Sequence, residues 1–470
     1  MELFQSHDFN DRLPEALLDL LQQEPVVSHA YVVGGFVRDA LLGEPSKDID
    51  IEVFGTSYAK LASALERWGR VDQVGRSFGV IKLTLPGCKA IDFTIPRQDA
   101  KINPGHRGFS VQFSQNMTQQ EAVTRRDFTI NALFYDPRER YVMDCVNGLE
   151  DLSQKRLRVV DRTSFAEDPL RVLRAMQFAS RFDLEIDAEL LSLSQEMFPS
   201  FTELAKERIC EEWLKWAAKS RRPSAGLEFL LRCRWIEHFP ELSAIVDVPQ
   251  DPEWHPEGDV FAHTCYCCDA LSELPEWKCL PPGDRSVYLM ATLLHDLGKA
   301  TTTVEALRNG SLRVVSPGHE QVGGRWAKNF LARLGVPHAF HQRVIPLVAN
   351  HMVHLHEPTD RAIRRLAYRL QPETIKGLCM VMKADSLGRP PKPKTIPESI
   401  RQLQKRSESL ELEQAAPKNI LQGRDLLRLG IKPGPKMGEI LAKVFNAQLD
   451  GQITTRESAI AWAQSKKLIQ

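Results

Sequence analysis

Residues 34–51 read GGFVRDALLGEPSKDIDI, and this stretch places Asp48 and Asp50 one residue apart on a predicted β-strand. Alternate side chains of a strand share one face of the sheet, so the two carboxylates point the same way. Parallel carboxylates repel each other unless a cation lies between them. The pair therefore predicts a divalent metal site. Mg²⁺ suits this site because it takes few protein carboxylates and completes its shell with water and phosphate oxygens.

Gly34 and Gly35 follow the apolar run AYVV and precede a predicted helix that starts near Phe36. Backbone N–H groups at such a turn can approach a phosphate closely, and the helix N-terminus favours the negative charge. Together with two metals, the turn indicates a nucleoside triphosphate site. The metals would activate an attacking hydroxyl and stabilise the departing pyrophosphate. Asp92, in the later run AIDFTI, is a candidate third carboxylate. The alternative is a solvated strand edge at DID and a simple turn at GG.

The composition of the chain predicts several domains, because 470 residues exceed what a single core accommodates and 43% of them are hydrophobic. Lys plus Arg and Asp plus Glu both number 61, so the net charge of zero gives no electrostatic argument for or against nucleic acid. We expect a cytoplasmic protein with no membrane association, because no run reaches the roughly 18 apolar residues of a membrane span and no signal-peptide pattern is seen. The nine cysteines lack paired C-x-x-C spacing and predict reduced thiols. The cluster Cys265, Cys267 and Cys268 predicts helix packing, with a zinc knuckle as the less favoured alternative.

Hydrophobic periodicity divides the chain into five predicted parts of an α+β protein. Residues 1–145 mix β-rich runs such as GVIKLTL and NALFYD with helical segments, which predicts an α/β head. Residues 146–250 are predicted to form a helical neck and body, and residues 251–390 a helical domain rich in histidine. Residues 391–418 are polar and Pro-punctuated, which predicts a linker with one solvated helix, and residues 419–470 predict a small helical tail.

Five stretches occur in the order of the motifs of the class II tRNA nucleotidyltransferases. They are GGFVRDALLGEPSKDIDI, RRDFTINALFYD (125–136), DCVNGLEDL (144–152), EDPLRVLRAMQFASRF (167–182) and ERICEEW (207–213). The chain thus resembles this family, which includes CCA-adding enzymes and bacterial poly(A) polymerases. The resemblance implies a polymerase-β-type nucleotidyltransferase head followed by helical neck, body and tail. It also implies Mg²⁺ in the head, tRNA, CTP and ATP as partners, and tRNA binding by the tail, for which a simple helix-turn-helix packing unit is the alternative.

The resemblance assigns roles to individual residues of the head. Asp48 and Asp50 are implied to be catalytic and to bind the metals. Nucleotide binding is implied for Gly34, Gly35, Arg38, Arg126, Asp127, Asn131, Asp168, Arg171 and Arg174. For Asp127 the alternative is an N-cap before a core helix. For Asp144, Asn147 and Gly148 a structural turn between head and neck is the favoured interpretation.

Asp168 and Arg171 are the candidates for selecting the base, because at i and i+3 on a predicted helix they share one face. An aspartate accepts from the exocyclic amine of cytosine or adenine, and an arginine donates to the ring nitrogen or carbonyl beside it. Arg174 is predicted to add a further contact, and Glu207 and Arg208 to brace the helices. The alternative is that Asp168 and Arg171 form an ordinary ion pair on a helix surface.

A second constellation lies where histidine is abundant, since ten of the thirteen histidines fall between residues 238 and 356. Six residues appear in an order resembling the HD phosphohydrolase family: His263, His295, Asp296, His319, His351 and Asp385. Imidazole and carboxylate ligands suit transition metals such as Ni²⁺ or Mn²⁺ better than Mg²⁺. The resemblance implies a phosphatase or 2′,3′-cyclic phosphodiesterase that acts on RNA ends. His354 and His356 compete with His351 for its place.

The sequence therefore predicts template-independent addition of CCA to tRNA 3′ ends from CTP and ATP by two-metal nucleotidyl transfer, with an additional HD-domain phosphohydrolase activity. Within the same class, the alternatives are a CC-adding enzyme, an A-adding enzyme or a poly(A) polymerase. The choice between complete and partial addition depends on the loop at about residues 95–124. From a different class, the alternative is a tRNA-binding HD phosphohydrolase with an inactive head.

Overall fold

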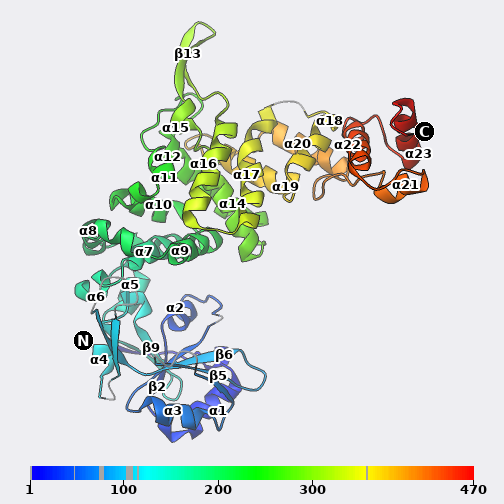
Figure 1. Ribbon diagram of the computed structural model, residues 1–470. Helices are drawn as coiled ribbons and strands as arrows, with labels where there is room; N and C mark the ends of the chain where they lie inside the picture. Colours follow the sequence, from blue (N-terminus) through cyan, green and yellow to red (C-terminus); the bar gives the residue numbers. More distant parts are fainter. Residues whose placement is uncertain are drawn as a thin grey trace. The chain divides into compact units, whose positions relative to one another are not determined.

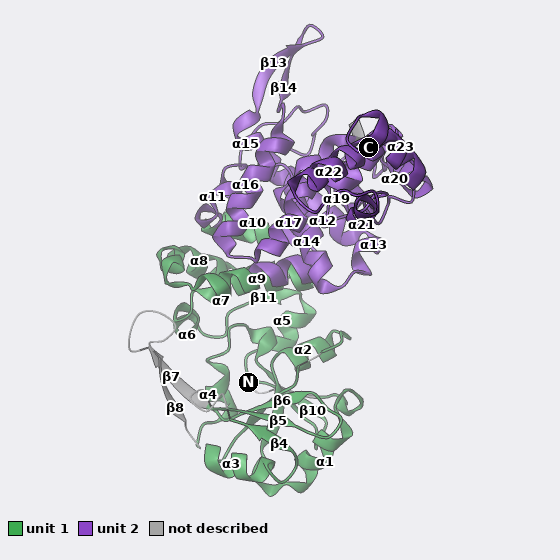
Figure 2. Cartoon of the chain, turned by 45° about the vertical axis from the view of Figure 1, so that its right-hand side comes forward, with its two compact units in different colours: residues 1–212, 225–235 green, residues 213–224, 236–470 purple. Residues whose placement is uncertain are grey.

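The computed structural model describes residues 3–46, 48–73, 79–101, 109–113, 116–355 and 358–469 (Figure 1). The chain divides into two compact units (Figure 2), of which unit 1 comprises residues 1–212 and 225–235 and unit 2 comprises residues 213–224 and 236–470. The predicted head and most of the predicted neck and body share unit 1. In the described ranges, no helix combines the length and apolar character needed to cross a membrane.

A mixed sheet of eight strands forms the centre of the head, in the order β1-β10-β9-β2-β3-β6-β5-β4 (Figure 1). The strands are β1 (Leu3–Ser6), β2 (Ala30–Val33), β3 (Asp50–Val53), β4 (Arg70–Asp72), β5 (Val80–Thr84), β6 (Ala90–Thr94), β9 (Leu133–Asp136) and β10 (Tyr141–Asp144). Strands β3 and β6 pair in parallel, and the other described neighbours in this sheet pair antiparallel. Strands β7 (Arg97–Lys101) and β8 (Phe109–Phe113) form a separate antiparallel pair within the loop whose structure the sequence did not predict.

Apolar side chains are buried on both faces of this sheet at β2. Val32 belongs to a core cluster with α1 (Glu15–Gln23) and α3 (Tyr58–Leu65), whereas its neighbour Val33 belongs to a second cluster with α4 (Gln119–Val123). Asp50 pairs with Val33 across the strands, and directly paired residues share a face. The sheet therefore holds Asp50 on the face opposite to α1 and α3, at the end of β2 where the glycine turn begins.

Within the head, η4 (Thr129–Asn131) precedes β9. Short helices and strands follow the head in unit 1, namely α5 (Gly148–Ser153), β11 (Arg156–Leu157), α6 (Arg162–Ala166), α7 (Leu170–Phe182), β12 (Glu185–Ile186) and α8 (Ala188–Glu196). Helices α9 (Lys206–Lys219) and α10 (Pro223–Arg232) each contribute residues to both units. Gly226 lets α10 approach α7, because a Cβ there would lie 2.4 Å from the Met176 carbonyl oxygen. Its N–H donates to Ser180 Oγ at 2.9 Å.

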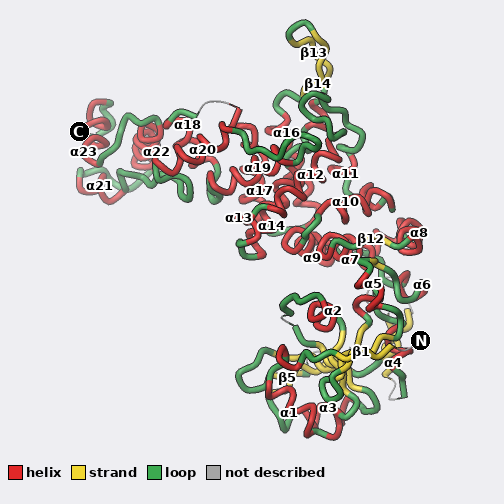
Figure 3. Tube along the Cα trace, turned by 180° about the vertical axis from the view of Figure 1, so that it is seen from behind, coloured by secondary structure: helices red, strands yellow, loops and turns green. Residues whose placement is uncertain are grey.

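Unit 2 is mostly helical (Figure 3). Its first helices are α11 (Pro240–Ser243), α12 (Val260–Glu273), α13 (Pro275–Lys278), α14 (Pro282–Leu294), α15 (Lys299–Thr302), α16 (His319–Leu334), α17 (His338–Asn350), η7 (His351–Leu355), α18 (Asp360–Arg369) and α19 (Ile375–Leu387). Helices α12, α14, α17 and α19 pack against one another. A hairpin of β13 (Val304–Arg308) and β14 (Ser311–Val315), which the sequence did not predict, turns at Asn309 and Gly310, both with positive φ.

The predicted linker contains the expected helix, α20 (Glu398–Ser409). This helix is not fully solvated, because it buries Ile400 and Leu403 and packs against α19. The tail consists of α21 (Gly423–Arg428), α22 (Pro435–Leu449) and α23 (Arg456–Ser465). These helices share a small core of their own that includes Leu426, Ile440 and Ala459. The tail therefore has its own apolar contacts to hold it folded.

Candidate functional site

The strand register sets Asp50 of β3 directly beside Asp92 of β6. Asp48 precedes β3 and does not lie on the strand with Asp50 as predicted, and it is exposed, whereas Asp50 is half-buried. Burial raises the pKa of Asp50, and the carboxylates of Asp92 and Asp48 add to this effect, whereas Arg126 opposes it. A divalent cation would neutralise carboxylates grouped in this way, so the residues present fit a metal.

Asp92 is already paired with a cation of the protein. Lys82 Nζ lies 2.9 and 3.1 Å from its two carboxylate oxygens, and Lys82 is half-exposed. Across the described ranges, the groups of three or more potential metal ligands whose donor atoms lie within 4.8 Å of one another all belong to unit 2. Asp50 and Asp92 are thus neighbours on the sheet, but in the described ranges the head carboxylates do not form a group of three ligands within 4.8 Å of one another.

Gly34 brings the predicted phosphate turn against Arg126. Its φ of +69° is a conformation that favours glycine, and a Cβ there would lie 3.5 Å from Arg126 Nη1. Arg126 Nη2 donates to Glu52 Oε2 at 2.9 Å. Glu52 lies on the same face of β3 as Asp50 and was not predicted as a site residue. The sequence signal was its position two residues after Asp50, because alternate residues of a strand share a face. A phosphate at the glycine turn would therefore meet a guanidinium that Glu52 holds in position.

Arg38, predicted to bind the triphosphate, is buried in contacts with the protein itself. Its Nε and Nη2 donate to Asp39 Oδ1 at 2.9 and 2.6 Å, and its Nη1 donates to Asn131 Oδ1. The guanidinium lies 4.6 Å from the centre of the Phe182 ring. Burial lowers the pKa of Arg38, and Asp39 opposes this effect. In this structure Arg38 joins α2 (Gly35–Leu41) to η4 and α7.

Asp127 is also buried, and both of its oxygens are used. Oδ1 accepts from the Phe128 N–H at 2.8 Å and from Asn131 Nδ2 at 3.0 Å, and Oδ2 accepts from Arg174 Nε at 2.7 Å. Burial alone would raise the pKa of Asp127, but Arg174 and Asn131 outweigh it, and the pKa lies below its ordinary value. Asp127 thus fixes the positions of two other predicted nucleotide-binding residues.

Helix α7 begins at Leu170, so Asp168 precedes the helix on which it was predicted to lie. The physical reason is Pro169, which disfavours helical conformation at the residue before it. Asp168 pairs with Arg208 of α9 rather than with Arg171, through Nη1 to Oδ1 at 3.2 Å and Nη2 to Oδ2 at 2.7 Å. The bracing role predicted for Arg208 is therefore confirmed.

Arg171 is held by backbone carbonyl groups. Its Nη1 donates to the Ser164 oxygen at 2.7 Å, and its Nη2 donates to the Arg125 oxygen at 2.8 Å. Burial lowers the pKa of Arg171, whereas Asp127 and Asp168 raise it. The two predicted base-selecting residues are thus each fixed by separate partners.

Asp144 confirms the favoured structural interpretation of its motif. Its carboxylate is fully buried and accepts from the N–H groups of Val146, Gly148 and Leu149 at 3.0, 3.0 and 2.8 Å. Asn147 has φ of +61°, and a Cβ at Gly148 would lie 2.2 Å from the Thr129 oxygen. The turn therefore packs α5 tightly against η4.

The six predicted ligands of unit 2 lie in one buried cluster, although they come from five separate segments of the chain. His263 lies on α12, His295 and Asp296 follow α14, and the others lie on α16, η7 and α19. Each of the six is less than a tenth exposed. Asp296 lies 3.2 Å from His295 Nε2 and 3.3 Å from His319 Nε2. His351 Nε2 lies 3.2 Å from His319 Nε2, whereas the side chains of the alternatives His354 and His356 lie outside the described part of the chain.

Backbone carbonyl groups orient three of these imidazoles. The Nδ1 atoms of His295, His319 and His351 lie 2.7, 2.8 and 2.7 Å from the carbonyl oxygens of Thr292, Ser316 and Val348 respectively. A carbonyl only accepts, so each Nδ1 carries a proton, which leaves Nε2 as the ring atom that could bind a metal. This is the arrangement that orients histidine ligands in metal sites. Burial lowers the pKa of His351 to about 3, which keeps it neutral.

Two cations balance the two carboxylates of the cluster. Lys299 Nζ lies 2.7 Å from Asp296 Oδ2, and Arg389 Nη2 lies 2.5 Å from Asp385 Oδ1. Burial would raise the pKa of both acids, but for Asp296 the effects of His295 and Lys299 prevail, and for Asp385 that of Arg389. The buried His295 Nε2 makes no hydrogen bond of good geometry among the described residues, although Asp296 Oδ2 lies 3.2 Å away. Because such a buried nitrogen is unfavourable without a good hydrogen bond, the residues present fit a metal ion.

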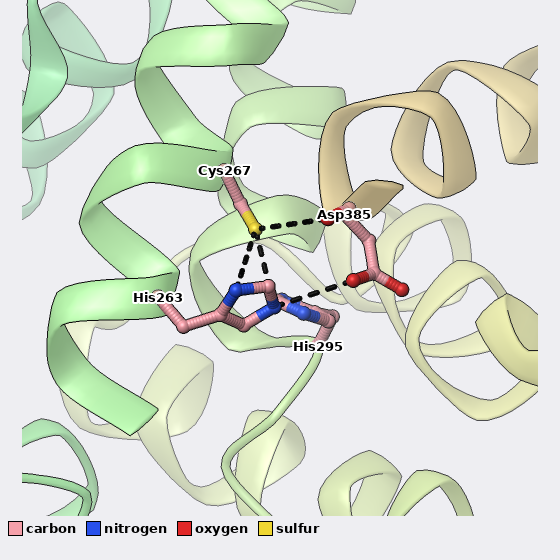
Figure 4. Close-up of side chains that lie close together, drawn as sticks. All are labelled: His263, Cys267, His295 and Asp385. Atoms are coloured by element: carbon pink, nitrogen blue, oxygen red, sulfur yellow. Dashed lines mark hydrogen bonds and ion pairs between the residues drawn. The ribbon is translucent and has the colours of Figure 1, made fainter. Parts of the chain in front are cut away.

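Three further residues belong to this cluster and were not predicted. Glu257 Oε1 lies 2.7 Å from His263 Nδ1 and 2.9 Å from His255 Nδ1, and these two histidines outweigh burial and lower the pKa of Glu257 to about 2. Cys267 Sγ lies 3.3 Å from His263 Nε2 (Figure 4). The signals were the polar lead-in WHPEGD and the spacing of four residues between His263 and Cys267, which on a helix gives a shared face.

Two family models match the chain. Residues 30–158 match the poly A polymerase head domain, and residues 322–463 match the putative tRNA nucleotidyltransferase domain 2. Among solved structures, a Thermotoga maritima CCA-adding enzyme in complex with tRNA has a TM-score of 0.60 at 20% identity, with 99% of this chain and 100% of that chain covered. A CCA-adding enzyme in complex with CTP has a TM-score of 0.63 at 20% identity, with 99% of both chains covered. These similarities confirm the α+β fold.

Curated relatives are closer in sequence. A multifunctional CCA protein of Xanthomonas campestris is 34% identical over 447 residues, which cover 93% of this chain and 98% of that protein. A multifunctional CCA protein of Xylella fastidiosa is 35% identical over 372 residues, which cover 77% and 84%. The similarity extends over both units of the structure, and the chain accordingly belongs to the multifunctional CCA protein family of tRNA nucleotidyltransferases.

Proposed function

We propose that the chain adds CCA to the 3′ ends of tRNA from CTP and ATP in the head of unit 1. The observation that carries this proposal is the register of β2, β3 and β6, which sets Asp50 beside Asp92 and next to the glycine turn. Family membership supports it, and so do the fold neighbours, whose names include CCA-adding enzymes in complex with tRNA, CTP and ATP.

Asp48 and Asp50 would hold Mg²⁺, which when bound activates the attacking hydroxyl and neutralises the departing pyrophosphate. The N–H groups of Gly34 and Gly35 would bind the triphosphate, and Arg126 would contact it from the position in which Glu52 holds the guanidinium. Arg38 and Asp127 would act through Asn131 and Arg174, the residues that they hold.

Asp168 and Arg171 would select the base. A rigid protein template needs side chains with fixed orientation, and the bonds from Arg208 to Asp168 and from Arg171 to two carbonyls provide it. A carboxylate accepts about four hydrogen bonds, and Asp168 accepts three within the protein, from Arg208 and from the Leu170 N–H. The remaining lone pair could accept from the exocyclic amine of cytosine or adenine.

Nucleotide addition is tested with tRNA ending at the discriminator base, at C and at CC, with CTP and ATP supplied separately. Full CCA addition requires CTP incorporation on the first two substrates and ATP incorporation on the third. Incorporation at only some ends would identify a CC-adding or A-adding enzyme, and repeated ATP incorporation would identify a poly(A) polymerase. Absence of all addition from a folded protein would leave the alternative of an inactive head.

We further propose that residues 251–390 of unit 2 form an HD-type metal-dependent phosphohydrolase that acts on RNA ends. The observation that favours this second function is the buried convergence of the six predicted ligands. They would hold a transition metal such as Ni²⁺ or Mn²⁺, which when bound activates water for attack on a phosphoester. Lys299 and Arg389 would keep the carboxylates oriented. Hydrolysis of a 2′,3′-cyclic phosphate at an RNA end, measured with and without added metal, tests this activity.

The tail, residues 419–470, is proposed to bind tRNA. Its turn between α21 and α22 contains Gly430 and Gly434, both with positive φ. Backbone N–H groups at such a turn are able to contact phosphates without reading the base sequence. Deletion of the tail should therefore raise the KM for tRNA while leaving hydrolysis of a mononucleotide 2′,3′-cyclic phosphate unchanged.

A further inference from the structure

Cys267 is placed among the proposed metal ligands of unit 2 (Figure 4). It follows His263 by four residues on α12, and the thiol is fully buried. The donor atoms of His263, Cys267, His295 and Asp385 all lie within 4.8 Å of one another. In this set the buried His295 Nε2 makes no hydrogen bond of good geometry among the described residues, and Asp296 Oδ2 lies 3.2 Å from it. The thiol therefore lies in a buried group of atoms that are able to bind one metal ion.

The distances around His263 are those of neighbouring ligands on one ion. Its Nε2 lies 3.3 Å from Cys267 Sγ and 3.2 Å from Asp385 Oδ1. Metal–ligand bonds of about 2.0–2.3 Å in a tetrahedral site separate adjacent ligand atoms by about 3.3–3.8 Å. Direct coordination of one ion by sulfur, nitrogen and oxygen therefore needs only small adjustments of these side chains.

Gly388 makes the space for Cys267. A Cβ at Gly388 would lie 2.6 Å from the Cys267 backbone nitrogen and 2.6 Å from its Sγ. Gly388 ends α19, three residues after Asp385, and its carbonyl oxygen lies 3.2 Å from His263 Nδ1. The close approach of α12 and α19 thus brings the thiol and the carboxylate to the same imidazole.

We propose that the Cys267 thiolate is a ligand of the metal in unit 2. A site of imidazole, carboxylate and thiolate favours Zn²⁺, Co²⁺ or Ni²⁺ over Mn²⁺ and Mg²⁺, because sulfur is a soft donor. The thiol gives up its proton to solvent when the ion binds. Cys267 is then the residue that determines which metal the phosphohydrolase uses. This inference rests on the phosphohydrolase centre proposed above.

Cobalt spectroscopy of the full-length chain tests the inference. The protein is stripped of metal with a chelator and loaded with one equivalent of Co²⁺. Sulfur bound to Co²⁺ produces an intense charge-transfer band in the near ultraviolet, which imidazole and carboxylate ligands do not produce. The band should be present in the unmodified chain, lost in Cys267→Ala and retained in Cys268→Ala. Cys268 is the matched control because it is the next residue, is equally buried and belongs to none of the ligand groups found in the described ranges.

A competition between Zn²⁺ and Mn²⁺, followed by metal analysis, gives a second measurement. The unmodified chain should prefer Zn²⁺ to Mn²⁺, and Cys267→Ala should reduce this preference because the soft sulfur ligand is removed. The thiolate assignment is wrong if His295→Ala abolishes Co²⁺ binding but the unmodified chain with bound Co²⁺ lacks the charge-transfer band. That result would leave the proposal of a metal centre intact. If neither Co²⁺ nor Zn²⁺ binds in a manner that depends on His295, the proposed metal centre itself is wrong, and the thiolate assignment with it.

Discussion

Asp127 fixes the positions of two residues of the proposed nucleotide site, although all of its described bonds are within the protein. It ties Asn131 to Arg174 through one buried carboxylate, and Asn131 in turn accepts from Arg38. A buried acid with such partners is stable only as the anion, which is why its pKa lies below the ordinary value. At the scale of residues, the fixed charge of Asp127 orders the groups that would contact the nucleotide.

The stability of unit 1 should therefore depend on Asp127 at low pH. Because the folded-state pKa is lowered, the stabilisation is present above the ordinary pKa of 3.8 and is lost as the pH falls through the lower folded-state value. Asp127→Asn should lower the free energy of unfolding at pH 7 by about 1.5–3 kcal/mol, the range for a hydrogen bond to a charged group. It should also flatten the loss of stability below pH 4. Thermal unfolding against pH measures both effects. Asp19→Asn, on the exposed face of α1, is the control, and an equal change in that variant would contradict the assignment.

Base selection should depend on Asp168 and Arg171. A lost pair of base-edge hydrogen bonds costs about 1–3 kcal/mol, so discrimination should fall by about one or two orders of magnitude. Asp168→Ala should admit UTP or GTP, and Arg171→Ala should weaken CTP and ATP together. Competitive incorporation with all four nucleotides on tRNA ending in C and in CC measures the effect.

Arg208→Ala tests whether the orientation of Asp168 matters, since Arg208 holds both of its oxygens. This variant should lose selectivity in the same direction as Asp168→Ala but to a smaller extent. Unchanged selectivity in both Asp168→Ala and Arg171→Ala would exclude the template role and leave a structural one.

Helices and strands were predictable where their hydrophobic pattern is long, and much less so where it is short. The runs AYVV, DIDIEVF and AIDFTI became β2, β3 and β6, and β3 and β6 carry Asp50 and Asp92. Strands such as β4 have three residues with little burial, and no periodicity can be read over so few positions. The partners of Asp168 and Asp127 depend on contacts between distant segments, which spacing along one element does not specify.

The packing of α10 on α7 should be sensitive to Gly226. Gly226→Ala places a Cβ within 2.4 Å of the Met176 carbonyl oxygen, so the helices must separate. Overpacking of this kind costs about 1–3 kcal/mol, which urea unfolding of the full chain measures. Gly438→Ala is the control, and it should change the free energy of unfolding in the opposite direction, because Gly438 lies within α22 and no atom beyond its own neighbours along the helix lies within 4 Å of where its Cβ would be. That variant should gain about 0.5–1 kcal/mol. Equal stability of Gly226→Ala and the parent chain would show that the interface yields without strain.

On the scale of the whole molecule, each unit has its own core and its own candidate site. The carboxylates of the head belong to unit 1, and the six proposed ligands of the phosphohydrolase belong to unit 2. The family models also match separate stretches, residues 30–158 and 322–463. The two proposed activities should therefore be separable by single substitutions.

Asp50→Ala should reduce addition of both C and A at least about a thousandfold, because the metals supply several kcal/mol of transition-state stabilisation. It should leave phosphodiesterase activity unchanged. His295→Ala should have the reverse effect. Both activities are measured on the same preparations, with circular dichroism to verify folding. Loss of both activities in one folded variant would contradict the assignment of separate sites.

The carbonyl groups that hold His295, His319 and His351 also affect how unit 2 should respond to removal of the proposed metal ion. A ring whose Nδ1 is already bonded to the backbone has little rotational freedom, so binding an ion removes little further conformational entropy. These rings are therefore ordered when the protein folds, before an ion binds. Chelation should therefore leave the helices of unit 2 packed, and the same protein molecules should be able to exchange one metal for another without unfolding.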